Sequence, residues 1–127
     1  MIQSGTFLNV VDNSGAKTVA CIKILSGYRS RYASVGQVIL VSIKSLRSKR
    51  RASSKIKKGE IYNALIVRTL APMKSFQGDS FKFFTNSVVL LSKQNKFLGT
   101  RVFGIVPKSL RYTKFLKVLS LSPGCIF

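Results

Sequence analysis

The apolar residues of this chain occur in short runs, and this pattern is the strongest constraint on its fold. VILV at 38–41 and ALIV at 64–67 have the length of a strand, not of a helix. A membrane-spanning helix needs about 20 consecutive apolar residues, and no run approaches that length. The chain is therefore predicted to be mainly β.

Several strands follow one another with turn residues between them. The expected strands cover 6–11, 17–25, 37–45, 60–70, 80–84 and 87–91. In 17–25, Ala20, Ile22 and Ile24 fall on one face, with the period of two that is expected of a strand. The two-residue spacing between the last two strands predicts a hairpin. Short strands with little helix favour a small closed β-barrel, because closure leaves no exposed sheet edge.

Helix is expected only near the end of the chain, over 107–119. Pro107 suits the start of a short helix over 108–112, and Thr113 can cap a further turn that runs into Phe115 and Leu116. The 127 residues fit one domain, 1–127, with a core of its own.

The charge of the chain is extreme. Lys and Arg number 22 against three Asp and Glu, for a net charge of +19. Such a protein repels itself, and a polyanion relieves the repulsion. Nucleic acid is the commonest polyanion. An anionic membrane surface is the alternative, but it usually requires a basic amphipathic helix, and the sequence shows no convincing one.

The segment 44–58 concentrates this charge between two predicted strands. Eight of its fifteen residues are basic and none is acidic, so we expect a loop or extended ribbon that contacts RNA or DNA phosphates. A solvated loop or a localisation signal is the alternative interpretation.

Catalysis and metal binding are poorly supported. The chain has no His, and its carboxylates, Asp12, Asp79 and Glu60, lie in or beside turns, where local hydrogen bonding explains them. Cys21 and Cys125 are too isolated for a zinc site. We expect Cys21 to be buried, Cys125 to be incidental, and the protein to be no enzyme and to need no cofactor or metal.

Aromatic and basic residues alternate in GYRSRY at 27–32. Tyr28 and Tyr32 could stack on bases, but we interpret them as covering the end of the barrel, with Arg29 and Arg31 pointing outward to phosphates. A second aromatic group is expected in the core or at a protein interface: Phe81, Phe83 and Phe84.

Seven segments resemble, in order and over essentially the full length, the L-fourteen family of large-subunit ribosomal proteins. DNSGA and GTRVFG are the most specific of their sequences. The segments are MIQxxTxLNVxDNSGA at 1–16, CIKIL at 21–25, RYASVGQVI at 31–39, KKG at 57–59, IVRT at 66–69, GTRVFGxV at 99–106 and SLSP at 120–123.

The resemblance implies a five-stranded barrel with a projecting β-ribbon and short helices near the C-terminus. It also implies a structural role: binding large-subunit rRNA, packing beside proteins three and nineteen of that subunit, and bridging to small-subunit rRNA. In bacteria and organelles a ribosome-silencing factor can dock on this family, at positions that match Thr100, Arg101 and Lys117. Neither DNA nor a membrane is an expected partner.

The residues expected to bind RNA are the cations of the segments above, together with one turn amide. They are Asn13, Lys17, Arg29, Arg31, Arg47, Lys49, Arg50, Arg51, Lys55, Lys57, Lys58, Arg68 and Arg101. Two other roles remain open, a free single-strand-binding module with an OB-like barrel and a cationic protein of membrane surfaces.

The chain departs from the family in several places. Gln37 stands where the family usually has Asp, LAPMKSFQGDS at 70–80 replaces a basic loop, and PGCIF replaces the usual ending. The resemblance therefore assigns no contacts to 70–86 or to the tail. Few acids with abundant Phe, Ser and Lys suit an A/T-rich organellar genome, and the start lacks a presequence pattern. The expected location is the mitochondrial matrix, with a plastid or the bacterial cytoplasm as alternatives.

Overall fold

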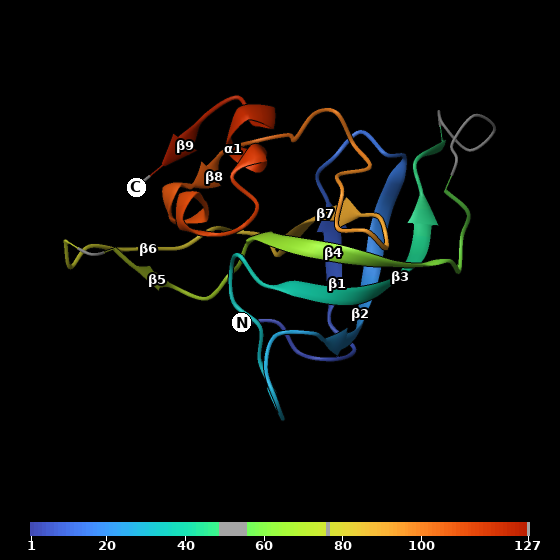
Figure 1. Cartoon of the computed structure of the whole chain (residues 1–127), viewed down its shortest axis with the longest axis horizontal. Helices are drawn as coiled ribbons and strands as arrows, with labels where there is room; N and C mark the ends of the chain where they lie inside the picture. Colours follow the sequence, from blue (N-terminus) through green and yellow to red (C-terminus); the bar gives the residue numbers. More distant parts are fainter. Residues whose placement is uncertain (49–55, 76, 127) are drawn as a thin grey trace.

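Five strands close into a barrel in the computed structural model, which describes residues 1–48, 56–75 and 77–126 (Figure 1). Neighbouring strands are antiparallel except β1 and β7, whose parallel pairing closes the barrel. The closed five-stranded barrel is thus confirmed. Its strands are β1 (Phe7–Val10), β2 (Ala16–Ile24), β3 (Val38–Leu46), β4 (Ile61–Arg68) and β7 (Ser87–Leu91).

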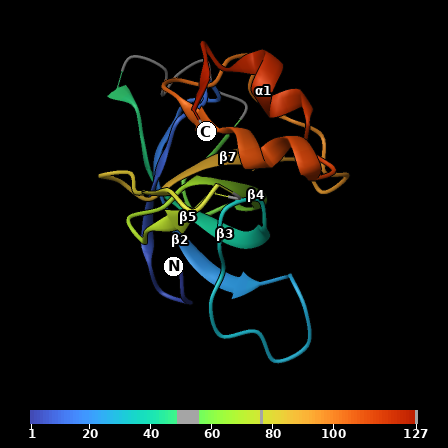
Figure 2. The same cartoon turned by 90° about the vertical axis from the view of Figure 1, so that its left-hand side faces the viewer.

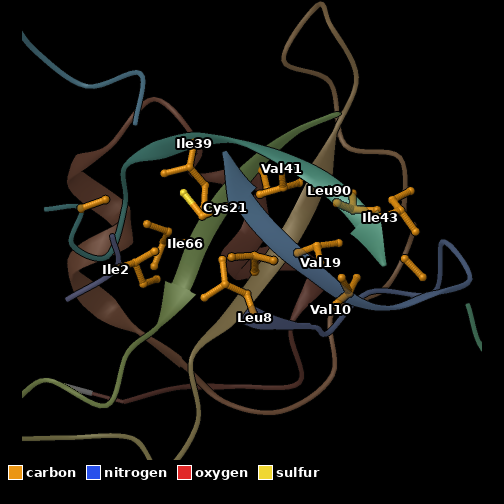
Figure 3. Packing of buried hydrophobic residues seen from close by; sticks show 14 of the residues in the cluster. Ile2, Leu8, Val10, Val19, Cys21, Ile39, Val41, Ile43, Ile66 and Leu90 are labelled. Carbon is orange, nitrogen blue, oxygen red and sulfur yellow. The ribbon is translucent and has the colours of Figure 1, made fainter. Parts of the chain in front are cut away.

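Branched aliphatic side chains fill the barrel. Figure 3 shows Val19, Ile39, Val41 and Leu90 pointing into one cluster from different strands. Cys21 is buried among them as expected, and its burial raises the pKa of the thiol. The exposed Cys125 is also a free thiol.

A β-bulge in β2 reverses which residues of this strand face the core. Cys21 pairs with Val41 and Lys23 with Leu40, so Ile22 is an extra residue without a partner on β3. The prediction that Ala20, Ile22 and Ile24 share one face was wrong, because the bulge brings Ile24 to the side of Cys21, inside the barrel, while Ile22 stays on the outer side. Ile22 is 42% exposed, whereas Ile24 beyond the bulge is 7% exposed.

Strands β4 and β7 are buried on both faces. Ile66 and Leu90 point into the barrel, whereas Leu65 and Val89 pack outward in a second apolar cluster. This second cluster lies under a C-terminal layer, which the two views in Figures 1 and 2 show beside the barrel. Double burial explains why these strands are continuous apolar runs and not alternating ones.

The C-terminal layer contains the short helices that were expected. It consists of β8 (Val106–Pro107), a 3-10 helix (Lys108–Tyr112), α1 (Lys117–Leu121) and β9 (Cys125–Ile126), with β8 and β9 paired in parallel. The Thr113 hydroxyl accepts a hydrogen bond from the Phe115 amide at 3.3 Å, although α1 begins only at Lys117. Among the described residues, no helix has both the length and the apolarity to span a membrane.

The hairpin predicted between 80–84 and 87–91 does not form. Strand β6 (Ser80–Phe81) pairs instead with β5 (Met73–Lys74), in a small ribbon that extends away from the barrel (Figure 1). The reason is that β7 pairs with β4 along one edge and with β1 along the other, so neither edge is available to β6.

The bulge predicts opposite costs for two neighbouring isoleucines. Ile24→Ala should lower the free energy of unfolding by about 2–5 kcal/mol, because it leaves a cavity in the core. The matched control Ile22→Ala should change it by less than about 0.5 kcal/mol. Urea unfolding followed by circular dichroism would measure both, and equal losses would contradict the bulge.

Candidate nucleic-acid interface

The cations predicted to bind RNA differ in exposure. Lys17, Arg29, Arg31, Lys57, Lys58 and Arg101 are exposed, whereas Arg47 and Arg68 are partly buried. Lys49, Arg50, Arg51 and Lys55 lie outside the described residues, together with the rest of 49–55, which is seven of the fifteen residues of the expected basic loop or ribbon. The described cations therefore form two classes, exposed cations and partly buried ones.

The exposed cations gather at opposite ends of the barrel. Lys17 begins β2 next to the end of β3, where the Arg47 amide donates to the Gly15 carbonyl at 2.9 Å. Lys57 and Lys58 join this first group, because the following residue, Gly59, donates to the Ile43 carbonyl. We call the exposed Lys17, Lys57 and Lys58, together with the partly buried Arg47 beside them, the β3-end cations.

The loop 25–37 after β2 carries Arg29 and Arg31 at the other end of the barrel. Its aromatic rings do not cover the barrel, since Tyr28 is 89% and Tyr32 54% exposed. The interpretation of these rings as a cover was therefore wrong. They stand in solvent beside the arginines.

The partly buried arginines hold the segment 99–105 against the barrel. Arg68 donates to the carbonyls of Phe103 and Ile105 at 3.1 and 3.4 Å, and burial lowers the pKa of its guanidinium. Arg47 donates to the Val10 carbonyl and lies over the Phe103 ring at 5.4 Å. Gly104 has a φ of +83°, and a Cβ there would lie 2.2 Å from a guanidinium nitrogen of Arg68. RNA binding by Arg47 and Arg68 stays a prediction, alongside this structural use.

The Asp12 carboxylate is fully buried and joins the first turn to β7. One of its oxygens accepts the amide and hydroxyl of Ser14, the local bonding expected for a turn. The other accepts the amide of Leu90, 78 positions away, at 2.8 Å. Sequence reasoning missed this second bond, because no local pattern indicates a partner on another strand.

The Asn13 side chain holds the backbone at Thr100 and Arg101, two of the positions that match the docking site of the silencing factor. Its side-chain oxygen accepts the amides of Thr100 and Arg101 at 2.8 and 3.3 Å, and its amide nitrogen donates to the Thr100 hydroxyl. Gly99 allows this approach, because a Cβ there would lie 2.8 Å from both Asp12 and Asn13. DNSGA and GTRVFG, the two most specific sequences, therefore meet in space.

Two basic hollows lie on the C-terminal layer. Arg101 lines one of about 400 Å³, together with Phe103 and Pro123. Lys117 lines another of about 560 Å³ with Lys96 and Lys114. No described carboxylate lines either hollow. Thr100, Arg101 and Lys117 are all exposed, so the C-terminal layer and the segment 99–105 beside it offer positive charge to a partner.

Glu60 holds the start of β4 beside the β3-end cations. Its carboxylate accepts the Lys57 amide at 2.9 Å and the Tyr62 hydroxyl at 2.8 Å, and these bonds lower its pKa. Like Asp12, it is engaged by amide and hydroxyl donors. In the part of the chain that the structure describes, no three His, Cys, Asp or Glu gather as a metal site would require.

Removing the Asp12 carboxylate should destabilise the fold. Asp12→Ala leaves the buried Leu90 amide without its acceptor, so we expect a loss of at least about 1–3 kcal/mol in the free energy of unfolding. Asp79→Ala, at an exposed carboxylate, is the control and should be close to neutral. Thermal unfolding followed by circular dichroism would measure the difference, and a neutral Asp12→Ala would refute this role.

The sequence of the chain matches a known protein family over nearly its full length. The family model described as Ribosomal protein L14p/L23e matches residues 1–126, nearly the whole chain. The match includes both of the sequences that meet at Asn13. Proteins of this family are non-enzymatic structural proteins of the large ribosomal subunit. The chain belongs to the ribosomal protein L14p/L23e family and is a structural constituent of the large ribosomal subunit.

Proposed function

We propose that the protein binds large-subunit rRNA through cations at both ends of its barrel, while its C-terminal layer bridges to small-subunit rRNA during translation. The observation that carries this proposal is that two of the described carboxylates accept hydrogen bonds from neutral donors and not from cations. The carboxylates of Asp12 and Glu60 accept amide and hydroxyl donors, so neither neutralises a cation through a direct hydrogen bond. The net charge of +19 already counts all three acids, and this excess of positive charge is what a polyanion would neutralise.

The rRNA contact is electrostatic in this proposal. Arg29 and Arg31 at one end and Lys57 and Lys58 at the other neutralise phosphates and release counterions. Arginine adds orientation, because its guanidinium can grip one phosphate through two parallel hydrogen bonds. A rigid barrel between the two groups fixes their spacing, which favours a folded RNA over an arbitrary single strand.

The bridge is assigned to Thr100, Arg101 and Lys117. Asn13 fixes the backbone of Thr100 and Arg101, and the Val102 amide donates to the Leu121 carbonyl at 3.0 Å, so the face is held from two sides. A preorganised basic face costs little ordering entropy on binding. The same face is the proposed site for a ribosome-silencing factor, and proteins three and nineteen are the proposed neighbours in the subunit.

Two double variants separate the proposed contacts. Arg101→Glu with Lys117→Glu should leave incorporation into large subunits intact but reduce joining to small subunits, because the charge reversal repels RNA across the interface. Arg29→Glu with Arg31→Glu is matched in charge and should instead reduce incorporation. Sucrose gradients of purified subunits at low and high magnesium would measure both steps.

Either of two results would reject these assignments. Normal joining by subunits that carry the Arg101 and Lys117 reversals would remove the bridge role. Recovery of the wild-type protein free of large subunits at moderate salt would remove the rRNA role.

We further propose that the ribosome is mitochondrial, with a plastid or the bacterial cytoplasm as the alternatives. The composition supports this, since only three acids accompany nine Phe in 127 residues. An antibody to the protein should label mitochondria in gradient-fractionated cells and sediment with mitochondrial large subunits after lysis. Labelling of plastids, or a source cell without organelles, would contradict it.

A further inference from the structure

The loop 25–37 leaves the barrel on a firm base. Ile2 and Ala33 exchange two backbone hydrogen bonds of 2.9 and 2.7 Å, and the Leu25 amide donates to the Val38 carbonyl. Both views show the loop extending away from the strands (Figures 1 and 2). Its tip is therefore carried clear of the barrel surface.

The tip presents a tyrosine ring with a cation beside it. Tyr28 is 89% exposed, and the guanidinium carbon of Arg29 lies 5.4 Å from the centre of its ring. Arg29 has a φ of +52° and Gly27 a φ of +91°. A left-handed conformation at a residue other than glycine is unfavourable, so this turn is held in an unusual form.

No role described above explains why the Tyr28 ring is exposed. It makes no part of either apolar cluster, and it lies at 26–30, between the two neighbouring segments that resemble the family. An exposed aromatic side chain gains nothing from hydrophobic burial in the free protein. The ring is thus free to gain its contacts from a partner.

We propose that Tyr28 stacks on an unpaired base of the large-subunit rRNA, while Arg29 and Arg31 bind the phosphates on either side. The inference rests on the proposed rRNA binding and adds a base contact to it. RNA loops offer splayed bases to aromatic and guanidinium planes, and stacking tolerates any base. No acid occurs between Asp12 and Glu60, so nothing in the loop repels the RNA backbone.

Three variants at position 28 isolate stacking from other contacts. The probe is deproteinised large-subunit rRNA from the same ribosomes, titrated with the full chain. Tyr28→Ala and Tyr28→Leu should weaken binding by roughly 5- to 140-fold, the loss expected for one stacked base. Tyr28→Phe keeps the ring and should keep the wild-type affinity. Because Tyr28 is exposed, none of these changes removes a core contact.

Salt dependence distinguishes the ring from its neighbours. Tyr28→Ala should leave the slope of log K against log salt unchanged, because no phosphate contact is lost. Arg31→Ala should flatten the slope by about 0.7–0.9 for its one phosphate. The chain contains no Trp, so Tyr28→Trp adds a single indole whose emission rRNA should quench by stacking.

The possible failures can be told apart. If the wild-type chain does not bind the rRNA, the proposed function fails. If it binds but Tyr28→Ala binds equally well, or the indole stays unquenched at saturation, only the stacking contact is overturned. Retention of affinity by Tyr28→Leu would also overturn stacking, since leucine has no ring to stack on a base.

Discussion

The buried carboxylate of Asp12 is the interaction on which the rest of the structure depends. It satisfies the Ser14 turn and the Leu90 amide together, and so joins the end of β1 to β7. A buried charge is tolerated only when hydrogen bonds replace its hydration. The neighbouring residue Asn13 then holds Thr100 and Arg101, and the Val11 carbonyl accepts the Phe103 amide at 2.7 Å. The barrel and the C-terminal layer are thus joined at one short turn.

This junction divides the basic residues between two tasks. Arg47 and Arg68 come from the set predicted to bind RNA, yet both donate hydrogen bonds to backbone carbonyls, and both contact Phe103. Guanidinium suits this use because it offers five donors in a fixed plane and stays charged. A further donor, the Nε–H group of Arg68, is buried and has no hydrogen-bond partner among the described residues. A contact with RNA at these positions would therefore be coupled to the placement of 99–105 and its exposed Thr100 and Arg101.

The strands could be predicted from the sequence because their signal is local. Val19, Cys21 and the runs 64–67 and 87–91 show strand character without knowledge of their partners. The predictions that were wrong depend on which strands pair with each other. Ile24 joins Cys21 inside the barrel only because β3 has no residue opposite Ile22. The hairpin after residue 80 fails because β1 and β4 already occupy both edges of β7. The same limit applies to the site, where the cations could be named but not their distribution over two ends of the barrel.

A neutral amide can replace a carboxylate at some positions of this fold but not at Asp12. Gln37 stands where the resemblance to the family implies Asp, and its side-chain oxygen accepts the Ser34 amide at 2.9 Å. A neutral amide therefore caps this turn while one negative charge is removed from the loop next to Arg29 and Arg31. The same exchange is not open to Asp12, because both of its oxygens accept donors and an amide nitrogen would face one of them. Asp12 thus needs both oxygens as acceptors and so needs its negative charge, whereas one oxygen is enough at Gln37, where a neutral side chain suits a loop proposed to contact RNA.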